Sequence, residues 1–153
     1  MVRNMSLCGL LRSGGCGVVV AIICCSCNIN PNSVAMADVS RRGWVEQIDL
    51  VYDNQDTSAL YDMGVVLRLS SGFQAKMLQL NMVIVTPDSL RYEERVALPV
   101  TVGQWHKEAE SKEIVLPYRQ NVHLARQGVY GVSITPEGSV VGVEAAGVIF
   151  EKR

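Results

Sequence analysis

The sequence predicts an all-β domain, a β-sandwich of about seven or eight antiparallel strands in a jelly-roll or immunoglobulin-like arrangement. Three observations lead to this prediction. Short segments rich in β-branched residues alternate apolar and polar side chains from residue 44 onward. Turn-forming residues separate these segments at short intervals, and no segment shows a convincing helical period. Two packed sheets are the usual solution for such a pattern.

Four strands are predicted in the first part of the domain, over residues 44–52, 60–69, 76–86 and 90–98. The third ends at Pro87-Asp88, where proline fixes φ and the aspartate side chain can bond the backbone ahead. Leu90, Tyr92 and Glu94 alternate after this turn, so residues 76–98 predict a hairpin. The arginines and glutamates of residues 89–98 also fit a helix, and this alternative stays open.

The second part of the domain begins with a polar stretch, residues 103–112, that predicts the longest loop. A short strand is expected over residues 112–116 and should end at Pro117, because proline cannot donate to a ladder. Residues 122–125 predict an edge strand. The last two strands are predicted over residues 129–135 and 143–151. Gly128 and the turn at Pro136 mark the boundaries of the first of them.

All five cysteines lie within the first 27 residues, and three of them, Cys24, Cys25 and Cys27, fall at the end of an apolar run. A metal site, a disulfide knot and a processing signal compete as explanations. A zinc site normally draws its ligands from two places in the sequence, and no second cysteine pair exists. The processing signal explains more, because Arg3 and Arg12 supply a positive region, residues 17–25 an apolar region, and Ser26 a small residue before the cut.

A small residue directly before a cysteine indicates the lipoprotein variant of such a signal, with Cys27 as the acylated residue. We therefore expect a signal peptide over residues 1–26, a flexible tether over residues 27–42, and a β-sandwich domain over residues 43–153. Pro31 and the lack of any period favour the tether. The apolar run is shorter than the roughly 20 residues of a spanning helix, so no transmembrane helix is expected.

Composition excludes several functions. The net charge of −1 becomes more negative once the signal is removed, and no basic stripe exists for nucleic acid. Only two histidines are present, His106 and His123, and no nucleophile elbow or glycine-rich phosphate loop occurs. We therefore predict no enzyme activity, no catalytic residues, no metal and no cofactor. Trp105 and His106 in the polar loop, with Tyr118, are the predicted contacts for a partner or ligand.

Some residue combinations go beyond generic strands: Gly43-Trp44, Leu60-Tyr61-Asp62, Thr86-Pro87-Asp88, Leu116-Pro117-Tyr118-Arg119, Gly128-Val129-Tyr130 and the closing segment of residues 141–152. In this order and spacing, they resemble the gliding-motility lipoprotein GldH family of the Bacteroidetes. The resemblance extends from about Gly43 to Lys152. Ser89 stands where the turn of the family usually has glycine.

The resemblance implies a lipoprotein of the gliding machinery and the linked type IX secretion apparatus. We thus expect a membrane-anchored, non-catalytic accessory that contacts other envelope lipoproteins or motility and secretion proteins. A periplasmic glycan- or peptide-binding module is the alternative. Asn28 after the anchor favours the outer membrane, and the missing Lys/Asp/Glu-rich export tract favours its periplasmic face.

Overall fold

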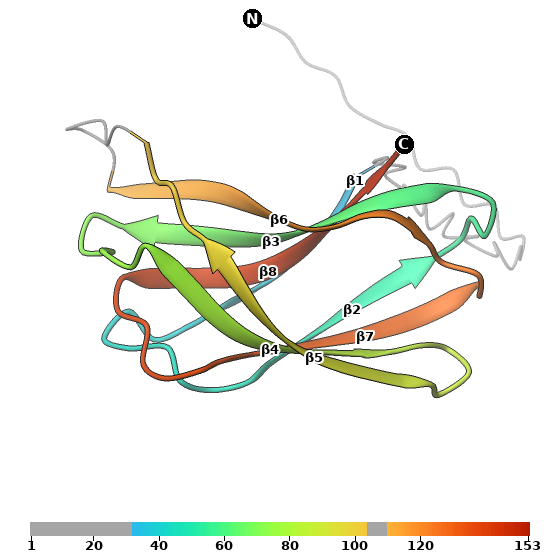
Figure 1. The fold of residues 1–153 in the computed structure, drawn as a ribbon, viewed down its shortest axis with the longest axis horizontal. Helices are drawn as coiled ribbons and strands as arrows, with labels where there is room; N and C mark the ends of the chain where they lie inside the picture. Colours follow the sequence, from blue (N-terminus) through green and yellow to red (C-terminus); the bar gives the residue numbers. More distant parts are fainter. Residues whose placement is uncertain (1–31, 104–109) are drawn as a thin grey trace, which may run out of the picture.

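The computed structural model describes residues 32–103 and 110–153 of the protein, and these residues form two packed antiparallel sheets (Figure 1). The eight strands are β1 (Asn32–Asp38), β2 (Ile48–Asn54), β3 (Leu60–Ser70), β4 (Met77–Val85), β5 (Arg91–Pro99), β6 (Ser111–His123), β7 (Gly128–Pro136) and β8 (Val143–Lys152). The predicted all-β sandwich is confirmed. The helix alternative for residues 89–98 is wrong, because they contribute β5. No helix with the length and apolarity to cross a bilayer occurs within the described residues.

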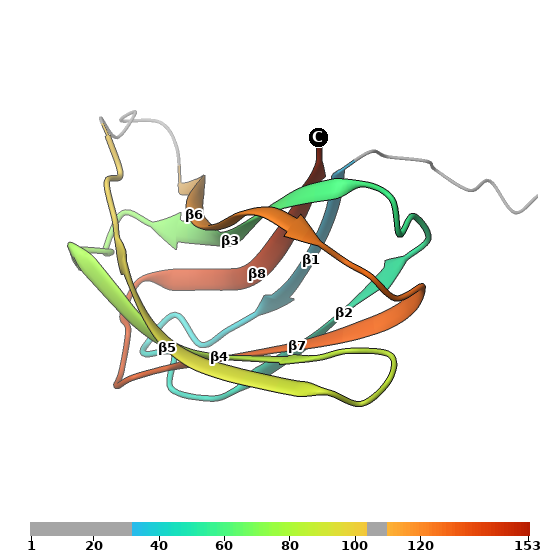
Figure 2. The same ribbon diagram turned by 45° about the vertical axis from the view of Figure 1, so that its right-hand side comes forward.

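The connectivity is that of a jelly roll, the first of the two predicted arrangements. One sheet has the strand order β1-β8-β3-β6 and the other β2-β7-β4-β5. The first four strands therefore pair in sequence with the last four, as β1·β8, β2·β7, β3·β6 and β4·β5. The chain thus forms one long antiparallel hairpin that is wrapped into two sheets. The turn between β4 and β5 lies at the end of this hairpin, and we call it the hairpin tip (Figure 2).

That tip is the hairpin predicted around Pro87. The Ser89 amide donates to the Thr86 carbonyl over 2.9 Å, and the Thr86 amide donates to the Leu90 carbonyl over 2.9 Å. Ser89 itself adopts a left-handed conformation with φ of 65°. A tight turn followed by one left-handed residue is the common three-residue hairpin loop, in which glycine is favoured at the last position. Ser89 thus takes the backbone conformation that suits glycine.

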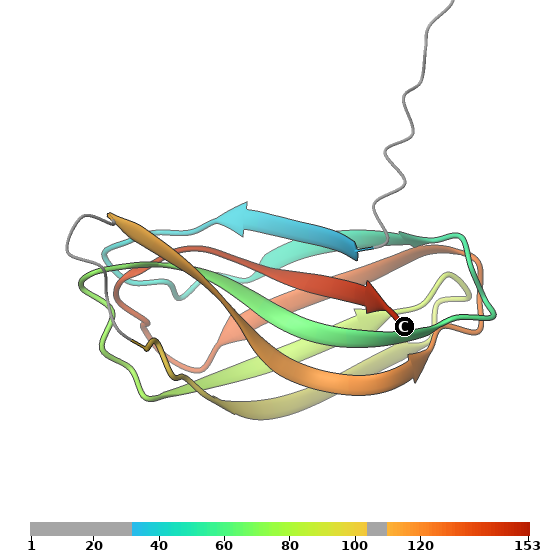
Figure 3. The ribbon, with the colours of Figure 1, turned by 90° about the horizontal axis from the view of Figure 1, so that it is seen from above.

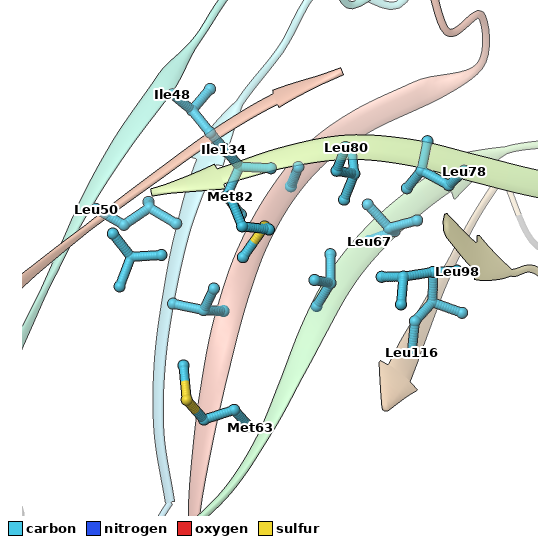
Figure 4. Close-up of a cluster of buried hydrophobic side chains, with 14 of the residues drawn as sticks. Ile48, Leu50, Met63, Leu67, Leu78, Leu80, Met82, Leu98, Leu116 and Ile134 are labelled. Atoms are coloured by element: carbon cyan, nitrogen blue, oxygen red, sulfur yellow. The ribbon is translucent and has the colours of Figure 1, made fainter. Parts of the chain in front are cut away.

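The core consists of the apolar side chains that alternate with polar ones along the strands. Leu67, Leu80 and Ile134 come from three different strands and are fully buried where the two sheets face each other (Figure 4). Trp44 is 1% exposed and donates its ring N–H to the Glu46 carbonyl over 2.7 Å. It lies outside β2 and forms only an isolated bridge with Val140, so the strand predicted from residue 44 begins at Ile48.

The prediction of a flexible tether over residues 27–42 is wrong for β1. This strand pairs with β8 along its whole length, from Asn32 opposite Glu151 to Asp38 opposite Ala145. Gly147 permits the close approach, because a Cβ added there would lie 2.1 Å from the Ala35 carbonyl oxygen. The small residues of β1 and β8, rather than an alternating pattern, make this contact fit.

The expected strand end at Pro117 is also wrong. β6 continues through Pro117 to His123 and absorbs both the predicted short strand and the predicted edge strand at residues 122–125. Proline is tolerated because β6 is an edge strand of its sheet and because the β3–β6 register shifts next to Gly64. A second shift follows near Asn121, which has a φ of 55°. The first residues of β6 lie in the predicted loop 103–112, most of which falls outside the described residues.

Candidate binding groove between β5 and β6

The edge strands β5 and β6 belong to different sheets and run along the same side of the sandwich (Figure 3). Alternate β5 side chains point between the sheets, and they are more exposed near the β4–β5 turn than at the far end of the strand. Leu98 is 7% exposed, whereas Tyr92 is 58% and Leu90 is 53% exposed. The two sheets therefore close over the core near Leu98 and separate toward the hairpin tip, leaving a groove between β5 and β6.

The part of the groove near the hairpin tip has a volume of about 390 Å³ and largely apolar walls. Its apolar surface comes from both sheets and includes Met63, Ile84, Leu90, Tyr92, Val122 and Phe150. Polar side chains stand at its rim, among them Asp88, His123 and Arg126. Such a mixture of apolar walls and a few polar groups is typical of a site that binds a ligand or a partner side chain.

The neighbouring part has a volume of about 550 Å³ and more polar walls. It shares Ile84, Tyr92 and Arg119 with the apolar part, so the two form one continuous groove. Glu94 and Tyr118 line it from opposite strands. The exposed Tyr92 side chain stands between an apolar and a polar compartment and can present either its ring or its hydroxyl to a partner.

A hydrogen-bonded cluster bridges the groove, which we call the Glu94 clasp and define as Glu94, Tyr118 and Arg119. The Tyr118 hydroxyl donates to the Glu94 carboxylate across the two sheets. The Arg119 guanidinium donates to the same carboxylate oxygen over 2.7 Å from Nη2 and 3.1 Å from Nε. It also lies 5.5 Å from the centre of the Tyr118 ring. The clasp ties β5 to β6 where the sheets begin to separate.

The clasp sets the protonation of its members. The hydrogen bond from Tyr118, followed by that from Arg119, holds the pKa of Glu94 below its usual range despite some burial. Burial and the Glu94 hydrogen bond raise the pKa of Tyr118 to about 12. At neutral pH the phenol is therefore protonated and Glu94 is ionised. This arrangement suits a structural clasp or a polar docking point, not a tyrosinate nucleophile.

The loop that closes the groove at the hairpin end is fixed by buried polar side chains. Asn54 is 0% exposed and donates to the carbonyls of Leu124 over 3.0 Å and Arg126 over 2.9 Å. The Tyr130 hydroxyl donates to the Arg126 carbonyl and accepts from the Arg126 amide, both over 3.1 Å. On the outside, Arg126 reaches Asp88 of the hairpin turn over 3.1 Å. These contacts fix the groove wall in one position.

The structure places Tyr118 in this groove, as one of the predicted contact residues. Trp105 and His106, the other two, lie outside the described residues, as does Cys27. His123 contacts the Thr57 carbonyl through Nε2 over 2.7 Å. Among the described residues, no group of three or more potential metal ligands comes together.

Sequence reasoning missed Leu90, Tyr92 and Arg119 as groove residues. Leu90 and Tyr92 fitted the core-facing side of a predicted strand, and their alternation gave no sign of exposure. One signal was available, because the charged residues of 91–95 flank them closely and buried strands rarely carry so many charges. Arg119 follows Tyr118 directly, but its partner Glu94 is far away in the sequence.

No protein-family model matches the chain, and no curated protein matches it either. The resemblance to the GldH family therefore rests on the residue combinations described above.

Proposed function

We propose that the protein is a lipid-anchored envelope lipoprotein, related to the GldH family, that acts by protein–protein contact in gliding motility or type IX secretion. The groove between β5 and β6 is its contact surface. One observation carries this assignment: apolar side chains that would normally complete the core are exposed between two free edge strands. Exposed apolar surface rimmed by polar groups commonly marks an interaction site. Catalysis plays no part in this function.

Acylation of Cys27 would hold the domain close to the membrane. β1 begins at Asn32, so the chain between the two residues spans at most about 18 Å even when fully extended. The strand starts at the same end of the sandwich as the hairpin tip and the apolar part of the groove, because Asn32 lies opposite Glu151 and Leu60 lies opposite His123. Partners would thus be bound near the membrane surface of the periplasmic face.

A cross-linked pull-down from envelope membranes, analysed by mass spectrometry, tests this function. Wild type is compared with Cys27→Ala, with the groove variant Tyr92→Thr, and with the matched control Val51→Thr, whose position is 68% exposed on β2. Motility or secretion proteins should be recovered with wild type and Val51→Thr, and lost with Cys27→Ala and Tyr92→Thr. Recovery of none by a membrane-bound wild type contradicts the proposal, and recovery by Tyr92→Thr excludes the groove.

A periplasmic glycan- or peptide-binding module is the second candidate. The continuity of a polar and an apolar compartment at the exposed ring of Tyr92 favours it, because sugars and short peptides use both kinds of surface. Calorimetric titration with defined oligosaccharides distinguishes this candidate. Saturable binding that is abolished by Tyr92→Thr and retained by Val51→Thr would favour it over a protein-docking surface.

A further inference from the structure

Only every second residue of β5 hydrogen-bonds to β4, and the backbone groups of the residues between them face outward. The ladder with β4 is fixed at both ends, by the Thr86 amide bonded to the Leu90 carbonyl and by the Val100 amide bonded to the Lys76 carbonyl. Bonded and outward-facing residues alternate in an antiparallel strand. The even-numbered residues of β5 therefore bond β4, and the amides and carbonyls of Arg91, Glu93, Arg95 and Ala97 point away from the sheet.

β5 is the better of the two strand edges that border the groove. It pairs with β4 from Arg91 to Pro99 without any register shift, so its outward groups keep a regular spacing. β6 is interrupted by two register shifts, lacks an amide hydrogen at Pro117 and turns left-handed at Asn121. A regular, unpaired edge is a template for another strand.

The side chains beside this edge define what could pair with it. Arg91, Glu93 and Arg95 lie on the outer face and give an alternating row of charges along the edge. Their present partners are exposed: Arg91 with Glu93 over 2.8 Å, and Arg95 with Glu137 over 3.2 Å. Exposed ion pairs contribute little, so they can exchange for new partners at low cost. On the other face, Leu90 and Tyr92 offer apolar surface.

A second copy of the chain is a poor occupant. Antiparallel self-pairing centred on Glu93 sets the two Glu93 carboxylates against each other and Arg91 against Arg95. The register that matches Glu93 with Arg95 instead sets the two Glu94 side chains directly opposite each other. Like charges opposite each other destabilise a strand pair. The register that sets Arg91 opposite Glu93 avoids this repulsion, but it overlaps only residues 91–93 of each β5, which is the lower limit of strand length. Charge and overlap together thus disfavour self-association and leave the edge to a complementary segment of another protein.

We propose that β5 binds an extended segment of a partner protein as an added strand. On the outer face this segment carries acidic residues opposite Arg91 and Arg95 and a basic or neutral residue between them. On the other face it carries apolar residues that cover Tyr92 and enter the groove. This inference rests on the proposed protein-contact function and specifies the chemistry of the partner at the same site.

Blocked peptides test the chemistry directly. The probe contains Glu-Val-Lys-Val-Glu, one control reverses the charges as Lys-Val-Glu-Val-Lys, and a second replaces valine as Glu-Ser-Lys-Ser-Glu. Binding is measured by NMR titration of the full chain. Each control should bind at least about tenfold more weakly than the probe, because opposite charges and apolar residues both stabilise cross-strand pairs. Equal binding of all three peptides, or no binding of the probe, overturns the proposal.

Amide hydrogen exchange shows whether a strand is added. In the free protein, the amides of Tyr92, Glu94 and Val96 should be protected by β4, whereas those of Glu93, Arg95 and Ala97 should exchange fast. Saturation with the probe should slow exchange of the second set by about tenfold or more. If the probe binds and the amides of Glu93, Arg95 and Ala97 still exchange fast, strand addition is overturned.

A proline substitution provides an independent test on the partner itself. Ala97→Pro removes one outward-facing amide hydrogen and leaves the hydrogen bonds to β4 intact. Proline is compatible with such a position, because Pro99 is also an outward-facing residue of β5. Ala97→Ser is the matched control. In the membrane pull-down, Ala97→Pro should lose the partner and Ala97→Ser should retain it. Retention by both overturns strand addition but leaves the proposed function intact. Failure of wild type to capture any partner contradicts the proposed function and, with it, the inference that rests on it.

Discussion

Asn54 and Tyr61 are hydrogen-bonded to each other inside the sandwich, with 3.1 Å between the Tyr61 hydroxyl and the Asn54 side-chain oxygen. The amide nitrogen of the same Asn54 side chain donates to the carbonyls of Leu124 and Arg126. One side chain from the end of β2 thereby joins the start of β3 to the loop between β6 and β7. The loop that walls the groove consequently depends on a residue far away in the sequence.

Replacement of Asn54 by leucine should destabilise the protein by about 3 kcal/mol, because it leaves the Leu124 and Arg126 carbonyls and the Tyr61 hydroxyl without a shared partner. Tyr61→Phe, which removes a single hydroxyl from this network, should cost only about 1 kcal/mol. Equilibrium unfolding in urea measures both losses. Equal losses for the two variants would show that Asn54 does not organise the loop.

Replacement of Ser89 by glycine should stabilise the protein by about 0.5–1 kcal/mol, because a left-handed conformation costs a non-glycine residue more than glycine loses in chain entropy. Ser89→Ala is the control and should give no gain, since alanine carries the same Cβ. Thermal unfolding of the three proteins provides the comparison. A loss of stability in Ser89→Gly would mean that the φ of 65° at this residue is not a source of strain.

Replacement of Tyr118 by phenylalanine should alter the pH dependence of stability at both ends. The pKa of Tyr118 is raised from 10.0 to about 12, so its contribution is fully present below pH 10 and is lost as the pH rises through 12. The pKa of Glu94 is lowered from 4.5, so its contribution is present above 4.5 and is lost as the pH falls through the lower, folded-state value.

In Tyr118→Phe the alkaline loss should shrink, and the pKa of Glu94 should move back toward its usual value because its main hydrogen-bond donor is gone. Urea unfolding over a pH series measures the first effect, and carboxyl NMR titration of Glu94 the second. The clasp would be contradicted if the variant and the wild-type protein lost stability in the same way at alkaline pH.

Replacement of Gly147 by alanine should disrupt the pairing of β1, because the new Cβ would lie 2.1 Å from the Ala35 carbonyl oxygen. Amides within β1 should lose protection from hydrogen exchange, and the protein should lose about 2 kcal/mol or more of stability. Gly131→Ala is the matched control, since the nearest atom to its Cβ would be 3.9 Å away on Val85. An unchanged exchange pattern in Gly147→Ala would show that β1 is not held against β8 as described.

Local patterns predicted the parts of this fold that depend on neighbours in the sequence. The alternation before and after Pro87 predicted the β4–β5 hairpin, and this is the only pair of consecutive strands that bond each other among the described strands. Every other pairing joins distant segments. Residues 32–38 carried no alternation, because β1 is selected by the small residues of β8, and those lie at the opposite end of the chain.

The groove was predicted only in part for the same reason. Tyr118 was singled out for its aromatic side chain, which is a local property. Exposure of Tyr92 depends on how far apart the sheets are at the hairpin tip, and no local pattern records that distance. Pro117 misled the prediction because its effect on a strand depends on whether the strand lies at an edge, which only the sheet order reveals.

The order in which the strands pair also determines how the molecule bears tension. β1 enters at the end of the sandwich where β8 leaves, and the two run antiparallel from Asn32–Glu151 to Asp38–Ala145. A pull that draws the domain away from its N-terminal segment, along the axis of β1, loads all hydrogen bonds of this ladder together in shear. A sideways pull would open them one after another. The β1–β8 ladder should therefore resist a force applied along the axis of β1 better than a force applied across it.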